Sequence, residues 1–221
     1  MNNVKLIVFD FDGTLCDTQR NILLTLKATI RDQKLPMRTD EQCISIIGLP
    51  LKDCFRTLFP HIDENQLQAC ADTYRRIFAE TLANVKPNPF PKVVNTIKCL
   101  KQLGFVLTIA SSRSHASLVE LTQAMNIFDC FSLLLGADDV DKAKPDPEPV
   151  LKTLRLTGFK PQDTMVVGDM PVDILMGSRA GAKTVGVSYG NGSAEDLRLA
   201  GADVIIDDFS ELLNIITDNP D

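Results

Sequence analysis

Apolar positions near the start of the chain form one strand pattern and then change to a helical spacing. The run Leu6-Ile7-Val8-Phe9 is apolar and rich in β-favouring residues, which predicts a buried strand. From residue 17 onward, apolar residues recur at intervals of three and four, as on one face of a helix. Four helices are expected there: one ending near Pro36, one starting at Thr39 or Asp40 and closed by Gly48-Leu49-Pro50, one over 51–58, and one from Asp63 or Glu64 to about Val85. No strand is expected within residues 17–86.

The pattern changes again after residue 86. The segment Pro87-Asn88-Pro89-Phe90-Pro91 cannot continue a helix and predicts a stiff linker. Strands are then expected at 106–110, 133–136, 165–167, 184–187 and 204–206, and helices at 92–103, 114–125, 147–157, 172–180 and 209–216. This alternation predicts an α/β fold, a doubly wound parallel sheet with helices on both faces. We interpret residues 17–86 as a helical cap domain inserted into a core of residues 1–16 and 87–221.

Composition narrows the class of protein. The 221 residues are 44% hydrophobic, which is ordinary for a globular protein with a sizeable core. The 29 acidic and 23 basic residues give a net charge of −6, which disfavours a general nucleic-acid binder because such proteins need a basic face. No apolar stretch approaches the length of a membrane span, so no membrane partner is expected. The six cysteines include no C-x-x-C pair, and we expect reduced thiols in the cytoplasm.

Two carboxylates follow the first predicted strand directly. Asp10 and Asp12 are one residue apart, so in extended chain they point to the same side, and Gly13 permits a tight turn after them. In an open parallel sheet, ligands bind just beyond the carboxyl ends of the strands. Neighbouring carboxylates repel, so either one keeps its proton or a cation lies between them. Taken alone, this pair is equally consistent with a helix cap or a solvated turn.

Other polar residues fall at or after later strand ends. Ser111, Lys144 and Asp169 would supply a hydroxyl, a cation and a metal ligand, which together suit phosphoryl transfer. Asp10 would be the nucleophile that forms an aspartyl-phosphate, and Asp12 would protonate the leaving alcohol and later deprotonate water. Asp169 would join Asp10 on a hard divalent cation, expected to be Mg²⁺.

Each of these later residues also has a structural alternative. Gly168-Asp169 is consistent with a plain strand-end turn, and Ser112 or Ser114 with helix capping. For the cation, Lys142 is the less favoured alternative to Lys144, whose backbone is restricted by the prolines that follow it.

The longer string Asp-x-Asp-Gly-Thr-Leu-x-Asp-Thr, which starts at Asp10, resembles the first signature of the haloacid dehalogenase superfamily of phosphotransferases. Three further segments match its other motifs in order along essentially the whole chain: Ser111, Lys144-Pro145-Asp146-Pro147 and Gly168-Asp169-Met170-Pro171-Val172-Asp173. The resemblance implies a Rossmann-like core with a small hairpin and a helical turn after the first strand. The helical insertion resembles the cap of the phosphoglycolate phosphatase-like branch, and Asp12 argues against the dehalogenases, which lack it.

The resemblance also implies residue roles. Asp10 would be the nucleophile and Asp12 the acid/base, with Ser111 and Lys144 on the phosphoryl group. Asp10, Asp169 and the main-chain carbonyl of Asp12 would bind the metal. A further set is expected to bind phosphate or to support the site from behind its ligands: Thr14, Ser112 and Asp173.

The helical insertion carries candidates for substrate specificity. Gly48-Leu49-Pro50-Leu51-Lys52 resembles the specificity loop of this branch, and Arg56 lies one helical turn beyond Lys52. An ordinary helix break explains Gly48 and Pro50 equally well. For Arg75 and Arg76 we expect a solvated helix face.

The expected function is a Mg²⁺-dependent phosphatase acting on a small phosphorylated metabolite. A phosphosugar mutase or an inorganic pyrophosphatase would use the same residues. A receiver-like signalling module would also need a phosphorylatable aspartate, a hydroxyl and a lysine, but the inserted cap and Asp12 weigh against it.

Overall fold

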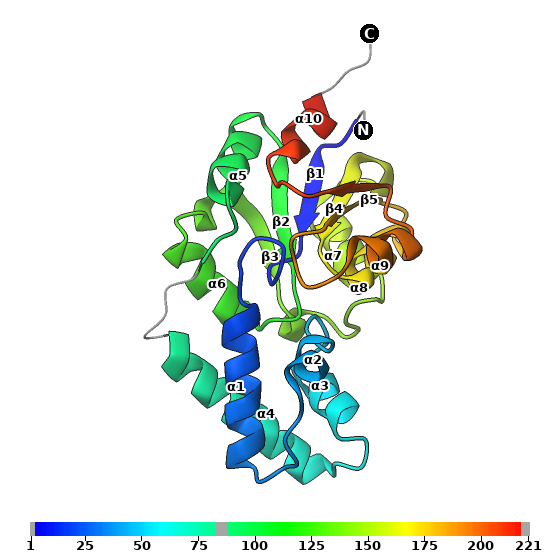
Figure 1. Ribbon diagram of the computed structural model, residues 1–221. Coiled ribbons are helices and arrows are strands. Elements are labelled where there is room, and N and C mark those ends of the chain that lie inside the picture. The colour runs from blue at the N-terminus through cyan, green and yellow to red at the C-terminus, as the bar shows by residue number, and fades with distance from the viewer. Residues whose placement is uncertain (1–2, 83–87, 218–221) are drawn as a thin grey trace.

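The computed structural model describes residues 3–82 and 88–217. Within them the strands form one six-stranded parallel sheet in the order β3-β2-β1-β4-β5-β6 (Figure 1). The strands are β1 (Leu6–Phe9), β2 (Val106–Ala110), β3 (Phe131–Leu135), β4 (Thr164–Gly168), β5 (Lys183–Val187) and β6 (Val204–Ile206). The expected Rossmann-like α/β class is confirmed. The third strand begins at Phe131, two residues earlier than the pattern predicted.

Strand β1 lies at the centre of the sheet, and all four of its residues are buried. It pairs in parallel with β2 on one side, where Phe9 lies opposite Ile109, and with β4 on the other, where Phe9 lies opposite Val167. Because these strands run in the same direction and end at similar heights, the residues that follow them emerge at one edge of the sheet.

Helices cover both faces of this sheet. They are α5 (Val93–Gln102), α6 (His115–Ala124), α7 (Glu148–Thr157), α8 (Pro171–Arg179), α9 (Ala194–Leu199) and α10 (Glu211–Thr217), with 3₁₀ turns at Phe128–Cys130, Ala137–Asp139 and Pro161–Asp163. Ile7 and Phe9 belong to one apolar cluster, whereas Leu6 and Val8 belong to another. This alternation is the period of a strand that is buried on both sides, as the continuous apolar run predicted.

Helices α1 (Gln19–Asp32), α2 (Asp40–Ile44), α3 (Leu51–Leu58) and α4 (Glu64–Leu82) pack around a separate apolar cluster. Leu26, Ile30, Phe55 and Leu67 are buried in that cluster. Helix α2 starts at a capping box, in which the Thr39 hydroxyl accepts from the Gln42 amide and the Gln42 side chain accepts from the Thr39 amide. In Figure 1 these helices lie beyond the end of the sheet toward which β1 points.

The connections between the two parts lie side by side. Cys16 forms an isolated antiparallel bridge with Pro89, and the Asp17 amide donates to the Asn88 carbonyl at 2.8 Å. Residues 11–16 make a tight turn, in which the Gly13 amide donates to the Cys16 carbonyl and the Leu15 and Cys16 amides donate to the Phe11 carbonyl. The bridge between Asp12 and Cys16 is parallel, so the hairpin that the family resemblance implies stays a prediction. The expected end of the fourth helix near Val85 and the domain boundary at 86/87 lie outside the described residues.

Among the helices of the described ranges, none is both long and apolar enough to cross a membrane.

Candidate active site

Asp10 follows β1 and is buried at the carboxyl edge of the sheet. The Lys144 ammonium donates to its Oδ1 at 2.5 Å and to Asp173 Oδ1 at 2.6 Å, so one cation joins two carboxylates. Burial by itself lowers the pKa of Lys144, but the pairing with Asp10 and Asp173 outweighs burial, and the pKa lies above its ordinary value. Lys144 is therefore directed into the site, as its restricted backbone predicted.

The carboxylates of Asp10, Asp169 and Asp173 form a compact cluster, with one oxygen from each lying within 4.8 Å of the others. Burial raises the pKa of Asp10 well above its ordinary value, and it raises the pKa of Asp169 to about 7, with the charge of Asp173 adding to both. When ionised, three buried carboxylates beside one lysine carry excess negative charge, and their oxygens are the ligands that Mg²⁺ prefers. The donor set thus fits a hard divalent cation.

Three hydrogen-bond donors hold the Asp169 carboxylate. Thr14 donates to its Oδ1 at 3.1 Å, and Asn191 donates to its Oδ2 through the backbone amide at 2.7 Å and through the side chain at 3.0 Å. A Cβ at residue 13 would lie 2.1 Å from Asp169 Oδ2, and Gly13 has a φ of +86°, so only glycine fits there. The expected supporting role of Thr14 stays a prediction, but its hydroxyl does contact the carboxylate cluster. Asn191 was not foreseen from the sequence.

The Asp12 carboxylate lies apart from this cluster and forms a nearly buried ion pair with Arg113. One Asp12 oxygen accepts from Arg113 Nη2 at 2.6 Å and from Nε at 2.9 Å, and it also accepts from the Thr18 hydroxyl. The guanidinium lies 5.7 Å from the ring centroid of Phe11 in the core and 4.7 Å from that of Phe78 in α4. Arg113 was missed by the sequence reasoning, although it lies between Ser112 and Ser114 in a segment already singled out.

The serines after β2 divide their roles. Ser114 caps α6 by accepting from the Ser117 amide, so Ser111 and Ser112 are not needed as caps. The buried Ser111 hydroxyl accepts from the Arg113 amide at 3.3 Å and lines the cavity beside Asp10. The Ser112 hydroxyl donates to the Gly48 carbonyl at 2.7 Å and so joins the core to the helical insertion.

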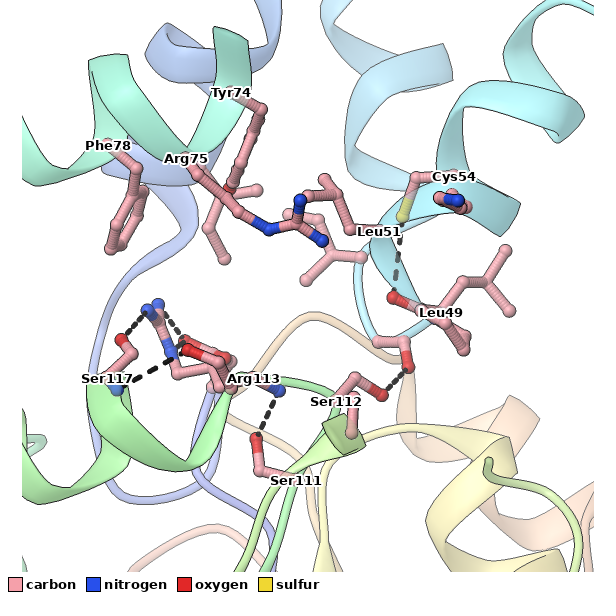
Figure 2. Close-up of a pocket in the computed structure, with 18 of the residues that line it drawn as sticks. Leu49, Leu51, Cys54, Tyr74, Arg75, Phe78, Ser111, Ser112, Arg113 and Ser117 are labelled. Carbon is pink, nitrogen blue, oxygen red and sulfur yellow. Dashed lines mark hydrogen bonds and ion pairs between the residues drawn. The ribbon is translucent and has the colours of Figure 1, made fainter. Parts of the chain in front are cut away.

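A cavity of about 810 Å³ lies between the sheet edge and helices α1, α3 and α4. Figure 2 shows Tyr74 and Phe78 pointing from α4 toward the opposite wall, which carries Ser111, Ser112 and Arg113. Arg75 extends from the same helix along the cavity. The core side of the cavity includes Asp10, Asp12 and Asp173.

Two specificity expectations need correction. Gly48 and Lys52 line this cavity, but Arg56 does not, because its guanidinium pairs with Asp53 at 3.1 Å and with Glu64 at 2.7 Å on the exposed side of α3. Arg75, expected on a solvated face, lines the cavity while also pairing with Asp72. Arg76 is exposed and pairs with Glu80, which fits the expected solvated face.

Comparisons with known proteins agree with this arrangement. A protein named Probable phosphatase IndB from Dickeya dadantii is 34% identical over 210 residues, which cover 94% of this chain and 91% of that protein. Pyrophosphatase PpaX from Anoxybacillus flavithermus is 33% identical and covers 97% of both chains. The crystal structure of a predicted phosphoglycolate phosphatase from Haemophilus somnus has a TM-score of 0.89 at 26% identity, covering 97% of this chain and 99% of that one. The model of the family described as haloacid dehalogenase-like hydrolase matches residues 7–187, and the chain belongs to this family of hydrolases.

Proposed function

We propose that the protein is a Mg²⁺-dependent phosphatase that hydrolyses a phosphate monoester of a small metabolite through an aspartyl-phosphate. The observation that carries this proposal is the contact of Asp10 with Lys144 inside a buried cluster of three carboxylates. Lys144 fixes the Asp10 carboxylate at the sheet edge, where Asp10 is placed to act as a nucleophile. The carboxylate cluster around Asp10 fits the metal ion that phosphoryl transfer needs.

The first step would transfer the phosphoryl group to Asp10. An Asp10 oxygen forms a bond to phosphorus while the bond from phosphorus to the leaving oxygen breaks. Lys144 and the Ser111 hydroxyl would bind phosphoryl oxygens, because both side chains lie beside Asp10 in the lining of the site. Mg²⁺ bound by Asp10 and Asp169 would neutralise charge on the phosphoryl group and favour the ionised form of Asp10.

Asp12 would move the protons. It lines the same cavity as Asp10, and three donors from Arg113 and Thr18 restrict its carboxylate. Asp12 would give a proton to the leaving alcohol, then take one from the water that attacks the aspartyl-phosphate and releases inorganic phosphate.

We also propose that residues 17–86 act as a cap that encloses the substrate. Its described helices have an apolar cluster of their own, and they form one wall of the cavity whose other wall holds Asp10 and Asp12.

Asp10→Asn tests the mechanism. The variant should lose hydrolysis of an alkyl phosphate in Mg²⁺, and rapid acid quenching should no longer trap labelled phosphate on the protein, because an amide oxygen is a poor nucleophile. Asp17→Asn is the matched control, since Asp17 is an exposed carboxylate in the same segment. Turnover by Asp10→Asn at the wild-type rate would disprove the role of Asp10.

Pyrophosphate hydrolysis is the second candidate, because a relative named Pyrophosphatase PpaX is 33% identical over nearly the whole chain. Phosphate is a better leaving group than an alcohol and needs less protonation, so Asp12→Ala should slow alkyl phosphate hydrolysis more than pyrophosphate hydrolysis. A higher kcat/KM of the wild type for pyrophosphate than for every monoester would favour this candidate.

A further inference from the structure

The two walls of the cavity differ in chemistry. The wall from the core is polar and carries the proposed phosphoryl chemistry, with Asp10, Ser111 and Arg113. The wall from the helical insertion is largely apolar, with Ile22, Leu26, Ile47, Leu49, Leu51 and Phe78 among its residues. A substrate bound across both walls would place its phosphate at the sheet edge and its leaving group against apolar side chains.

The volume is large for the relatives' named substrates. The cavity has a volume of about 810 Å³. It falls within the range of about 300–1,000 Å³ that is typical of sites for drug-sized ligands. Pyrophosphate and phosphoglycolate would fill only a small part of it.

The insertion already touches the core around this cavity. On one side Ser112 donates to the Gly48 carbonyl, and a Cβ at Gly48 would lie 3.5 Å from the Met170 side chain, which is ordinary contact. Elsewhere, the Gln19 side chain donates to Asn191 at 3.0 Å, and Arg113 lies against the ring of Phe78. The helical insertion therefore contacts the core at several points around the cavity.

Charge on the apolar wall is sparse. Lys52 and Arg75 are the basic residues there within the described chain, and Arg75 is engaged by Asp72. Tyr74 stacks on Phe78 with ring planes 13° apart and presents its half-buried ring to the cavity. With a compact, highly charged leaving group, these side chains would remain exposed to water, whereas a ring would cover them.

We infer that the preferred substrate is the phosphate monoester of an alcohol with a large, apolar, ring-bearing body, which packs against Tyr74 and the aliphatic side chains of the helical insertion. The inference rests on the proposed phosphatase function and names its substrate class. It separates this chain from hydrolysis of pyrophosphate or phosphoglycolate, to which the names of its relatives point.

Steady-state kinetics on matched esters test the inference. Ethyl phosphate and phenylethyl phosphate both release a primary alcohol, so the bond that breaks has similar reactivity in the two. With Mg²⁺, kcat/KM for phenylethyl phosphate should exceed that for ethyl phosphate by about tenfold or more, as expected for added groups in an apolar pocket. It should likewise exceed the values for phosphoglycolate and pyrophosphate.

Two variants assign the preference to the cavity. Tyr74→Leu removes the ring, and Ala79→Trp narrows the cavity from an exposed helical position that lines it. Each should lower the ratio of phenylethyl to ethyl kcat/KM by about tenfold, the scale of such pocket changes. Ala124→Trp is the matched control for Ala79→Trp, because Ala124 is an exposed alanine in α6 outside the cavity, and this variant should keep the ratio.

The possible outcomes distinguish failure of the proposed substrate class from failure of the proposed phosphatase function. Equal or better use of pyrophosphate, phosphoglycolate or ethyl phosphate would overturn the substrate class and leave the phosphatase function standing. A preference for phenylethyl phosphate that survives both Tyr74→Leu and Ala79→Trp would also overturn the assignment to this cavity. Failure to hydrolyse every ester would instead contradict the proposed function.

Discussion

The guanidinium of Arg113 binds a single carboxylate oxygen of Asp12, through Nη2 at 2.6 Å and through Nε at 2.9 Å. Both side chains are nearly buried, with exposed fractions of 9% for Arg113 and 14% for Asp12. Aromatic rings from the core and from the helical insertion lie against the same guanidinium. Arg113 thus touches both parts of the protein at once, and we propose that it positions the proposed acid/base.

Arg113→Lys should weaken proton transfer while keeping the positive charge. An ammonium cannot reproduce the paired N–H donors or the planar contact with the rings, so Asp12 loses its fixed orientation. We expect kcat on an alkyl phosphate to fall by about tenfold to a hundredfold, part of what a positioned acid/base contributes. On para-nitrophenyl phosphate, whose leaving group needs little protonation, the loss should be smaller.

Steady-state kinetics on both esters check this prediction, and thermal unfolding monitors the fold. Arg198→Lys is the control, because Arg198 is an exposed arginine that pairs with Glu195 on the surface. Equal losses of kcat on the two esters would contradict a role through Asp12.

Lys144→Ala should impair every substrate, because it removes a buried cation from beside the transferring phosphoryl group. The variant also leaves Asp10 and Asp173 without their shared partner. We expect kcat to fall by about 10²–10³-fold, the scale for loss of one preorganised donor. Lys142→Ala serves as the control, since Lys142 is exposed and lies 3.9 Å from Asp146 in a weak surface pair. Losses of kcat that match in the two variants would disprove the special position of Lys144.

Asp169 should make the stability of the metal-free protein depend on pH. Burial and the charge of Asp173 raise the pKa of Asp169 from 3.8 to about 7 in the folded chain. Between these values the folded state holds a proton that the unfolded state has released. Stability is therefore favoured at low pH and falls as the pH rises toward 7, by up to about 4 kcal/mol from this group.

Chemical denaturation in a chelator at pH 5 and pH 8 measures this effect. Asp169→Asn, which cannot ionise, should be stabilised relative to wild type at pH 8 and less so at pH 5. Adding Mg²⁺ should then stabilise wild type more than the variant, because a bound ligand favours the folded state. A stability difference that does not change with pH would show that Asp169 titrates normally.

Gly13→Ala should abolish activity through the Asp169 carboxylate. The new Cβ would lie 2.1 Å from Asp169 Oδ2 and 2.3 Å from Asn191 Nδ2, so the carboxylate must move. Gly104→Ala is a close control, because Gly104 has a similar φ of +90° but nothing within 4 Å of its added Cβ. Gly104→Ala should cost only about 1–2 kcal/mol for the left-handed backbone and keep its activity. Unchanged kcat/KM in Gly13→Ala would contradict the proposed metal site.

Local patterns predicted the sheet and the residues at its edge. Consecutive apolar residues predict a buried strand such as Leu6–Phe9. The carboxylates that follow this strand in the sequence lie at its end regardless of the tertiary packing. Local patterns did not predict the hydrogen-bond partners of these carboxylates. Arg113 lies 101 positions from Asp12, and Asn191 lies 22 positions from Asp169. Only tertiary packing brings such pairs together.

The same reason explains why two arginines of the helical insertion lie elsewhere than their sequence positions suggested. Arg56 was one candidate for contact with the substrate, because it lies one turn beyond Lys52. Its charge is instead engaged by Glu64, at the start of the next helix. The packing of α3 against α4 determines which face of each helix lies toward the core. The periodicity of apolar residues along one helix does not determine this orientation.

The bridge between Cys16 and Pro89 has a consequence for how this architecture can vary. The chain leaves the core at residue 17 and returns beside that point, with the Asp17 amide bonded to the Asn88 carbonyl. The two covalent connections to the helical insertion thus meet at one junction, which follows the segment that carries the proposed nucleophile. A different helical segment could be spliced in at that junction without rethreading any strand of the sheet. The proposed reaction centre and the surface proposed to select its substrate would in this sense be separate parts that can be exchanged independently.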